Sequence, residues 1–88
     1  MQEKTLTIKN KLGLHARPAA QFVQAATKYK SIIKLFKDDQ EVDGKSIMGI
    51  MTLAACIGSQ IKLVIAGEDE EMAMSELTEM IESGFGED

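Results

Sequence analysis

The sequence predicts an α+β fold, an open-faced β-sandwich with the element order β-α-β-β-α-β-α. Four short segments show the apolar–polar alternation of strands, and three show the apolar spacing of helices. The 88 residues suffice for one modest core but not for two. Because a small antiparallel sheet with so few helices can bury only one face, we expect a four-stranded antiparallel sheet with all three helices on the same side. Residues 1–88 should therefore form a single domain.

Residues 5–28 contain the first strand and the first helix. Leu6 and Ile8 alternate with threonines, which is typical of a half-buried strand. Apolar residues with helical spacing then predict a helix from about Ala16 to Lys28. These apolar positions are Ala19, Phe22, Val23 and Ala26. Pro18 is compatible with the first helical turn, where backbone N–H groups have no intrahelical partner.

The middle of the chain predicts a hairpin and then a fourth strand. Ser31 to Phe36 forms the second strand and Glu41-Val42 a short third, with Asp38-Asp39 as the turn of an antiparallel hairpin. Gln60 to Ile65 alternates again, with its isoleucines and leucine on one face.

Two further helices complete the predicted fold. A short helix is predicted from Ser46 to about Leu53. Asp43-Gly44, just before it, interrupts the regular secondary structure. The last helix begins near Asp69, and Gly84 is its expected stop. Its apolar side consists of Ala73, Leu77, Met80 and Ile81.

Composition excludes several classes of protein. The net charge of −4 is uneven, because residues 67–88 hold nine of the 14 acidic groups and none of the ten basic ones. We interpret this acidic segment as a solvated helix face, and such a chain argues against a nucleic-acid partner. No apolar run approaches the roughly 20 residues that span a bilayer, and the N-terminus lacks a signal pattern. A single cysteine, Cys56, favours the reducing cytoplasm and is interpreted as a small packing residue.

The segment Gly13 to Ala20 holds the only histidine, arginine and proline of the chain. If His15 lies at the N-cap, the positive end of the helix favours a neutral, nucleophilic ring, and the first N–H groups can bind a phosphoryl group. Arg17 can add charge-assisted bonds to the same oxygens. The alternative is that His15 is an incidental surface residue. One histidine and one cysteine are too few to predict a metal site, and no cofactor is indicated.

Residues 12–19, Leu-Gly-Leu-His-Ala-Arg-Pro-Ala, resemble the active-site signature of the HPr family, the histidine-containing phosphocarriers of the bacterial sugar phosphotransferase system. Residues 45–51, Lys-Ser-Ile-Met-Gly-Ile-Met, resemble its second signature. The resemblance implies that enzyme I phosphorylates Nδ1 of His15 and that the group passes to a histidine on IIA domains of sugar permeases. It also implies that Arg17 and the amides of Ala16 and Arg17 bind the phosphate. Such a protein is a carrier that forms a phosphohistidine, not an enzyme with its own turnover.

Ser46 has two compatible interpretations. Serine is a favoured N-cap, so it can be structural, and a phosphate is tolerated at that position by the helix dipole. The resemblance implies phosphorylation by the ATP-dependent HPr kinase/phosphorylase. The added charge would weaken docking to enzyme I and create a surface for a transcription regulator.

The helix after Ser46 has more apolar residues than one buried stripe requires. The surplus, Ile47, Met48 and Met51, predicts an exposed patch near His15, although a short and fully buried helix would show the same composition. Together with the resemblance, this favours a docking surface that includes Ala20, on a protein expected to be a monomer.

Three alternative functions compete with this prediction. A carrier of the nitrogen-related phosphotransferase branch, with mainly regulatory acceptors, is suggested by residues 83–88, whereas the Ser46 signature is similar to the sugar branch. A purely regulatory binding module is disfavoured because His15 is present. An RNA-binding module would need clustered aromatic residues on a strand, and the chain has no such cluster.

Overall fold

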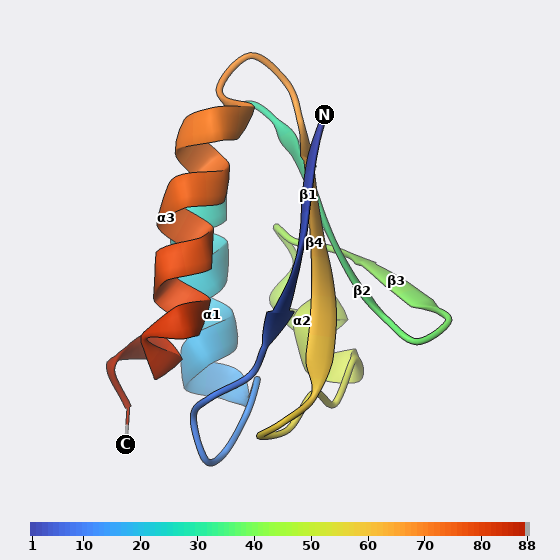
Figure 1. Ribbon diagram of the computed structural model, residues 1–88, viewed down its shortest axis with the longest axis vertical. Helices are drawn as coiled ribbons and strands as arrows, with labels where there is room; N and C mark the ends of the chain where they lie inside the picture. Colours follow the sequence, from blue (N-terminus) through green and yellow to red (C-terminus); the bar gives the residue numbers. More distant parts are fainter. Residues whose placement is uncertain (88) are drawn as a thin grey trace.

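The computed structural model describes residues 1–87 and confirms the predicted order of elements (Figure 1). A short 3-10 turn, Gly84–Gly86, follows the last helix. The elements are β1 (Gln2–Thr7), α1 (Ala16–Ala26), β2 (Ile32–Lys37), β3 (Gln40–Asp43), α2 (Ile47–Thr52), β4 (Gln60–Ala66) and α3 (Glu70–Glu82).

The four strands form one antiparallel sheet in the order β1-β4-β2-β3. The central strand β4 pairs Leu63 with Lys4 of β1 on one side and with Leu35 of β2 on the other. β2 and β3 form the predicted hairpin, and Asp38 occupies its turn with a φ of 54°. The predicted sheet class is therefore confirmed.

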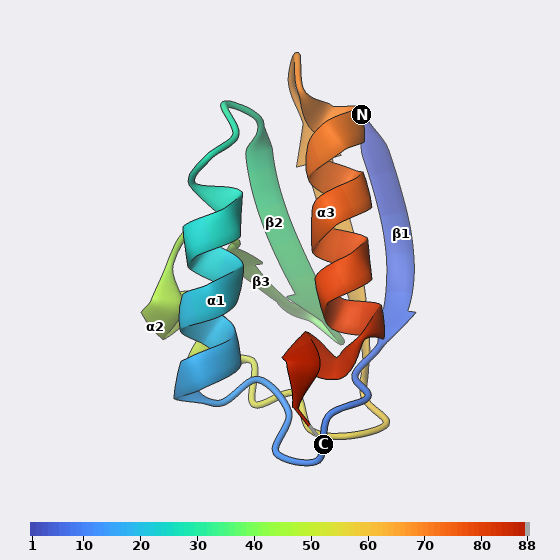
Figure 2. The ribbon, with the colours of Figure 1, turned by 90° about the vertical axis from the view of Figure 1, so that its left-hand side faces the viewer.

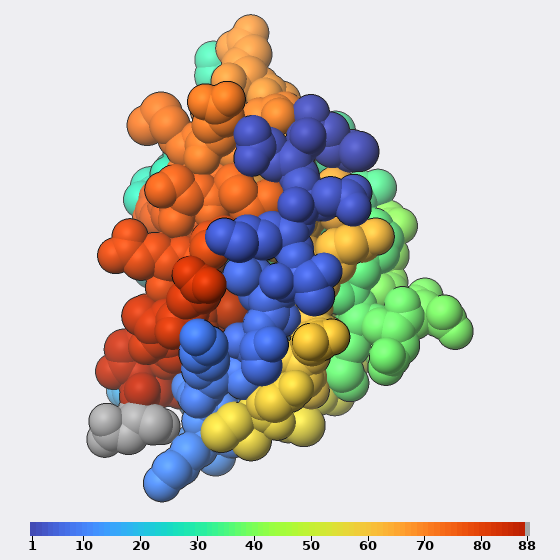
Figure 3. Space-filling model, in the orientation of Figure 1, coloured from blue at the N-terminus to red at the C-terminus, as the bar shows by residue number. Residues whose placement is uncertain are grey.

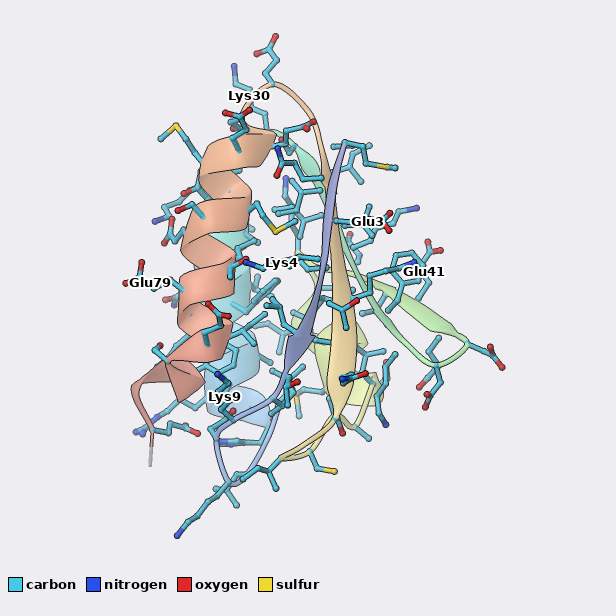
Figure 4. The ribbon with its side chains drawn as sticks, in the orientation of Figure 1. Glu3, Lys4, Lys9, Lys30, Glu41 and Glu79 are labelled. Carbon is cyan, nitrogen blue, oxygen red and sulfur yellow. The ribbon has the colours of Figure 1, made fainter. Side chains whose placement is uncertain are left out.

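Strand alternation separates the two faces of the sheet. Ile61, Leu63 and Ile65 of β4 are fully buried, while the residues between them face the other side. In β1, Lys4 extends toward α3 and Glu3 lies on the opposite side, where Glu41 of β3 also lies (Figure 4). The face that carries Glu3 and Glu41 is the open face of the sandwich.

The helices cover the other face, as predicted. Figure 2 shows α1 and α3 side by side in front of the sheet, and α2 packs against α1 and β3. Phe22 of α1 and Leu77 of α3 lie in one core with the buried strand residues. Val23 and Met80, predicted on the apolar sides of their helices, are only partly buried at the core margin.

Element ends differ from the predictions by a few residues. The helix expected to reach Lys28 ends at Ala26, because Lys28 and Tyr29 donate to carbonyls only three residues earlier and so tighten the last turn. β3 has four residues, since Gln40 and Asp43 also pair with β2. None of the helices within residues 1–87 is long and apolar enough to cross a membrane.

Candidate functional site

Three segments that are distant in sequence meet at one end of the molecule. They are the loop between β1 and α1, the loop before β4, and the turn after α3 (Figure 1). Figure 3 shows the first two, in blue and yellow, side by side at the lower end. Backbone hydrogen bonds join them, since Leu14 donates to the carbonyl of Ala55 at 2.9 Å and Ile8 donates to that of Ser59 at 2.9 Å.

Gly13 allows the close approach of these two loops. Its φ of +67° lies in the left-handed region, and a Cβ at this position would lie 2.2 Å from the carbonyl oxygen of Ala55. The glycine is therefore required both by its backbone conformation and by space. It sets the path of the chain into His15.

His15 is the N-cap of α1, as predicted. Its backbone is extended (φ −78°, ψ −171°), and its carbonyl accepts the N–H of Ala19 at 3.0 Å. The imidazole forms no capping hydrogen bond, so the ring remains available for other contacts. Pro18 has no N–H, which leaves the first-turn amides of Ala16 and Arg17 as donors for an anion.

The His15 ring contacts an acidic side chain from the far end of the chain. Both carboxylate oxygens of Glu87 lie 3.2 Å from Nε2 of His15. The His15 side chain is 35% exposed and that of Glu87 is 16% exposed. One ring nitrogen is therefore engaged in a partly buried contact.

Asn10 supports this contact. Its Nδ2 donates to Glu87 Oε1 at 3.0 Å and to the carbonyl of Gly13 at 2.8 Å. Desolvation raises the pKa of Glu87, but the hydrogen bonds from His15 and Asn10, together with nearby Arg17, outweigh it and hold that pKa below its usual value. The carboxylate is thus ionised at neutral pH.

A hollow of about 620 Å³ lies next to the ring. It brings together the predicted pair His15 and Arg17 with residues that were not predicted. Its lining consists of Lys11, Leu12, His15, Arg17, Gly86 and Glu87. Two cationic side chains and the start of a helix face one open space and outnumber the single carboxylate of Glu87, so this arrangement suits a small, multiply charged anion.

Sequence reasoning missed Glu87 and Asn10. Glu87 is 72 positions from His15, and periodicity carries no information over that distance. The one available signal is the Gly84-Phe85-Gly86 segment, which marks a turn after a helix but not its direction.

Ser46 is the N-cap of α2, as predicted. Its Oγ accepts the backbone N–H of Gly49 at 3.0 Å. A Cβ on Gly49 would lie 3.3 Å from that Oγ and 3.3 Å from Cβ of Val42, so the glycine leaves room for the cap. The hydroxyl therefore has a structural role as the cap of α2.

The surplus apolar residues of α2 are exposed. Ile47 is 41%, Met48 75% and Met51 42% exposed, whereas Ile50 and Leu53 are buried. We call Ile47, Met48 and Met51 the α2 patch. Ala20 of α1, predicted as a fourth docking residue, is half-buried.

The prediction that Cys56 is a packing residue is wrong. Its side chain is exposed, and its Sγ lies 3.5 Å from Oγ of Ser59. The helix predicted before it ends at Thr52, and Ala54 has a φ of 51°. The chain therefore turns before Cys56, and the neighbouring Ala55 is buried instead.

Comparison with known proteins gives consistent matches over nearly the whole chain. The family model "PTS HPr component phosphorylation site" matches residues 2–83. "Phosphocarrier protein HPr" of Xylella fastidiosa is 50% identical over 88 residues, covering 100% of this chain and 99% of the relative. The crystal structure of HPr-C-His from Thermoanaerobacter tengcongensis has a TM-score of 0.96 and 55% identity, covering 100% and 99% of the two chains. An HPr dimer from the same organism has a TM-score of 0.79 and 55% identity, covering 99% and 100%.

Proposed function

The chain belongs to the HPr family of phosphocarriers, and on that premise we propose that His15 accepts a phosphoryl group from phospho-enzyme I and passes it to a histidine on IIA domains of sugar permeases. One observation carries the residue assignment. His15 is at the start of α1, at the edge of a hollow that it shares with Arg17 and Lys11. Nucleophile and anion-binding groups thus lie together.

The transfer uses groups that lie at the start of α1. A ring nitrogen of His15 attacks phosphorus, the N–P bond forms, and the bond from phosphorus to its donor breaks. The amides of Ala16 and Arg17 and the Arg17 guanidinium bind the phosphoryl oxygens. Transfer to the acceptor reverses these steps and returns the free ring.

We assign docking of enzyme I and IIA domains to the α2 patch and Ala20. Support comes from the exposure of three large apolar side chains on a helix that packs against α1. Exposed methionines adapt to partners of different shape.

Phosphorylation of Ser46 is the regulation that we propose for this surface. Ser46 directly precedes the α2 patch, so a phosphate there places about two negative charges beside an apolar contact area. Docking of enzyme I should weaken. HPr kinase/phosphorylase and a transcription regulator are the partners that this proposal implies.

The sugar branch is preferred over the nitrogen-related branch because the signature around Ser46 is intact. The contrary indication, residues 83–88, includes Asp88, which lies outside the described residues. We also propose a cytoplasmic monomer. Because the similar Thermoanaerobacter protein has been crystallised as a dimer, sedimentation of the purified protein should test this state directly.

The assignment of His15 is tested with enzyme I and labelled phosphoenolpyruvate. Wild-type protein should acquire label that is stable in base and labile in acid, and His15→Ala should acquire none. Arg17→Ala should be labelled more slowly. Label that persists in His15→Ala would overturn the assignment.

The docking assignment needs its own control. Met48→Ala should raise the KM of enzyme I for this protein several-fold. Met72→Ala removes a similarly exposed methionine (68% exposed) from α3, outside the α2 patch, and should leave this KM unchanged. Equal behaviour of the two variants would contradict the docking surface.

A further inference from the structure

We propose that the side chain of Glu87 is a positioning residue for His15, which accepts the Nε2–H proton and so leaves the lone pair on Nδ1 as the nucleophile. This inference rests on the proposed function and deepens it, because it assigns the reacting nitrogen from contacts within this chain. A carboxylate at neutral pH only accepts hydrogen bonds. The ring nitrogen facing it must therefore carry the proton.

The Glu87 carboxylate contacts both the His15 ring and the side chain of Asn10. Oε1 of Glu87 lies 3.2 Å from Nε2 of His15 and accepts Asn10 Nδ2 at 3.0 Å. Asn10 is 1% exposed and is itself anchored to the carbonyl of Gly13. A buried amide thus holds the carboxylate in place, and the loop that carries His15 holds that amide.

The backbone after α3 directs Glu87 toward the site. Gly84, Phe85 and Gly86 all have positive φ, of 68°, 59° and 73°. The left-handed conformation is unfavourable for a phenylalanine, so it persists only where the surroundings enforce it. Phe85 is 7% exposed in the core, and Glu87 N–H donates to the carbonyl of Gly84 at 3.0 Å. Burial of the Phe85 ring thereby fixes the turn that places the Glu87 carboxylate beside His15.

This arrangement has a chemical consequence. When the bond from Nδ1 to phosphorus forms, the ring becomes electron-poor and its Nε2–H becomes more acidic. The adjacent carboxylate stabilises that N–H, so the proton stays on Nε2 while phosphorus arrives and leaves. Lys11 and Arg17, the other charged groups that line the hollow, remain available for the phosphoryl oxygens. Each transfer then needs no proton to move on or off His15.

The ring proton provides a direct test. The chain has one histidine, so a ¹H–¹⁵N spectrum of the labelled protein at pH 8 contains a single set of ring signals. Wild-type protein should show a protected Nε2–H signal. Glu87→Ala should lose it through exchange with water, and Glu87→Gln should keep it because the amide oxygen still accepts. Glu82→Gln removes a charge from the exposed end of α3 and should leave the spectrum unchanged.

Kinetics separates the two proposals. With enzyme I, Glu87→Ala should be phosphorylated about tenfold more slowly, the effect of losing one hydrogen bond to a charged group, and Glu87→Gln should recover most of the rate. If Nε2–H persists unchanged in Glu87→Ala, the inference fails even when wild-type protein is phosphorylated. If enzyme I does not label wild-type protein, the proposed function fails, while the spectrum still tests Glu87 on its own.

Discussion

The hydroxyl of Tyr29 donates a hydrogen bond to the carboxylate of Glu76, joining the turn after α1 to the middle of α3. Lys28 Nζ lies 2.8 Å from the other carboxylate oxygen. The hydrogen bond to Glu76 and, secondarily, burial raise the pKa of Tyr29 to about 12. Hydrogen bonds from Lys28 and then Tyr29 outweigh desolvation and lower the pKa of Glu76. The two helices are thus linked by groups whose titration reports on the contact.

Tyrosinate absorbance should reveal this link, because Tyr29 is the only tyrosine. We expect a titration midpoint near pH 12 in wild-type protein, and Glu76→Gln should move it toward the ordinary value of 10.0. A raised folded-state pKa contributes stability below pH 10 that is lost as the pH rises toward 12. The alkaline loss of stability should therefore be shallower in Tyr29→Phe.

The control for this titration is Glu79→Gln, which removes an exposed acid from the next turn of α3. It should leave the midpoint of Tyr29 unchanged. A wild-type midpoint at pH 10 would contradict the hydrogen bond.

The contact between Tyr29 and Glu76 also illustrates what sequence patterns can predict. The faces of α1 and α3 follow from apolar periodicity, and Phe22 and Leu77 are buried as that periodicity requires. The polar link between these helices joins residues 47 positions apart, where no periodic signal operates. Local spacing thus specifies faces, whereas polar pairs between elements depend on the tertiary fold.

The residues of the candidate site likewise fall into those that local sequence predicts and those that depend on the tertiary fold. His15 and Arg17 are predictable because both belong to one helix start, where local geometry determines their surroundings. Glu87 reaches the ring, and Asn10 reaches Glu87, only through two loops with positive-φ residues, whose directions a sequence pattern does not encode. The exposure of Cys56 was missed for the same reason, since the end of α2 and the turn at Ala54 determine it.

Gly13 should be far less tolerant of alanine than Gly58. Both have positive φ, of +67° and +86°, so both substitutions incur similar backbone strain of about 1 kcal/mol. A Cβ at Gly13 also meets the carbonyl oxygen of Ala55 at 2.2 Å, whereas one at Gly58 meets nothing within 4 Å. Urea unfolding should therefore show a clearly larger decrease in the free energy of unfolding for Gly13→Ala than for Gly58→Ala.

The phosphorylation rate should separate these variants as well. Gly13→Ala pushes the loop that carries His15 away from Ala55 and should slow labelling by enzyme I, while Gly58→Ala should label normally. Similar stabilities for the two variants would argue against the close packing at Gly13.

Ser46→Ala should destabilise the protein by about 1 kcal/mol, because it removes the hydroxyl that accepts the N–H of Gly49. Ser46→Asp restores an acceptor at the N-cap and should unfold at a urea concentration close to that of wild-type protein. Its added charge should nevertheless slow phosphorylation by enzyme I. Thr52→Ala, which removes a hydroxyl bonded to the carbonyl of Gly49 at the exposed end of α2, serves as the control. Wild-type kinetics for Ser46→Asp would contradict the proposed regulation.

Asp69 fastens the start of α3 to the chain entering β2. Its carboxylate accepts the backbone N–H groups of Lys30 at 2.8 Å and Ser31 at 3.0 Å, as well as the Ser31 hydroxyl. Gly67 allows this approach, because a Cβ there would lie 2.6 Å from Cα of Ser31. The Ser31 hydroxyl and then the Lys30 amide hold the pKa of Asp69 below its ordinary value of 3.8.

A lowered folded-state pKa contributes stability above about pH 3.8 that is lost as the pH falls through the folded-state value. Asp69→Asn removes this contribution, since the amide cannot accept all three hydrogen bonds as a carboxylate does. The variant should be less stable than wild-type protein at pH 7, and the two stabilities should converge as the pH falls through the lowered folded-state pKa of Asp69. Thermal unfolding across this range measures the difference, with Glu68→Gln as a control that removes a neighbouring exposed charge. A constant gap between wild type and Asp69→Asn down to pH 2 would show that the contact is not made by an ionised carboxylate.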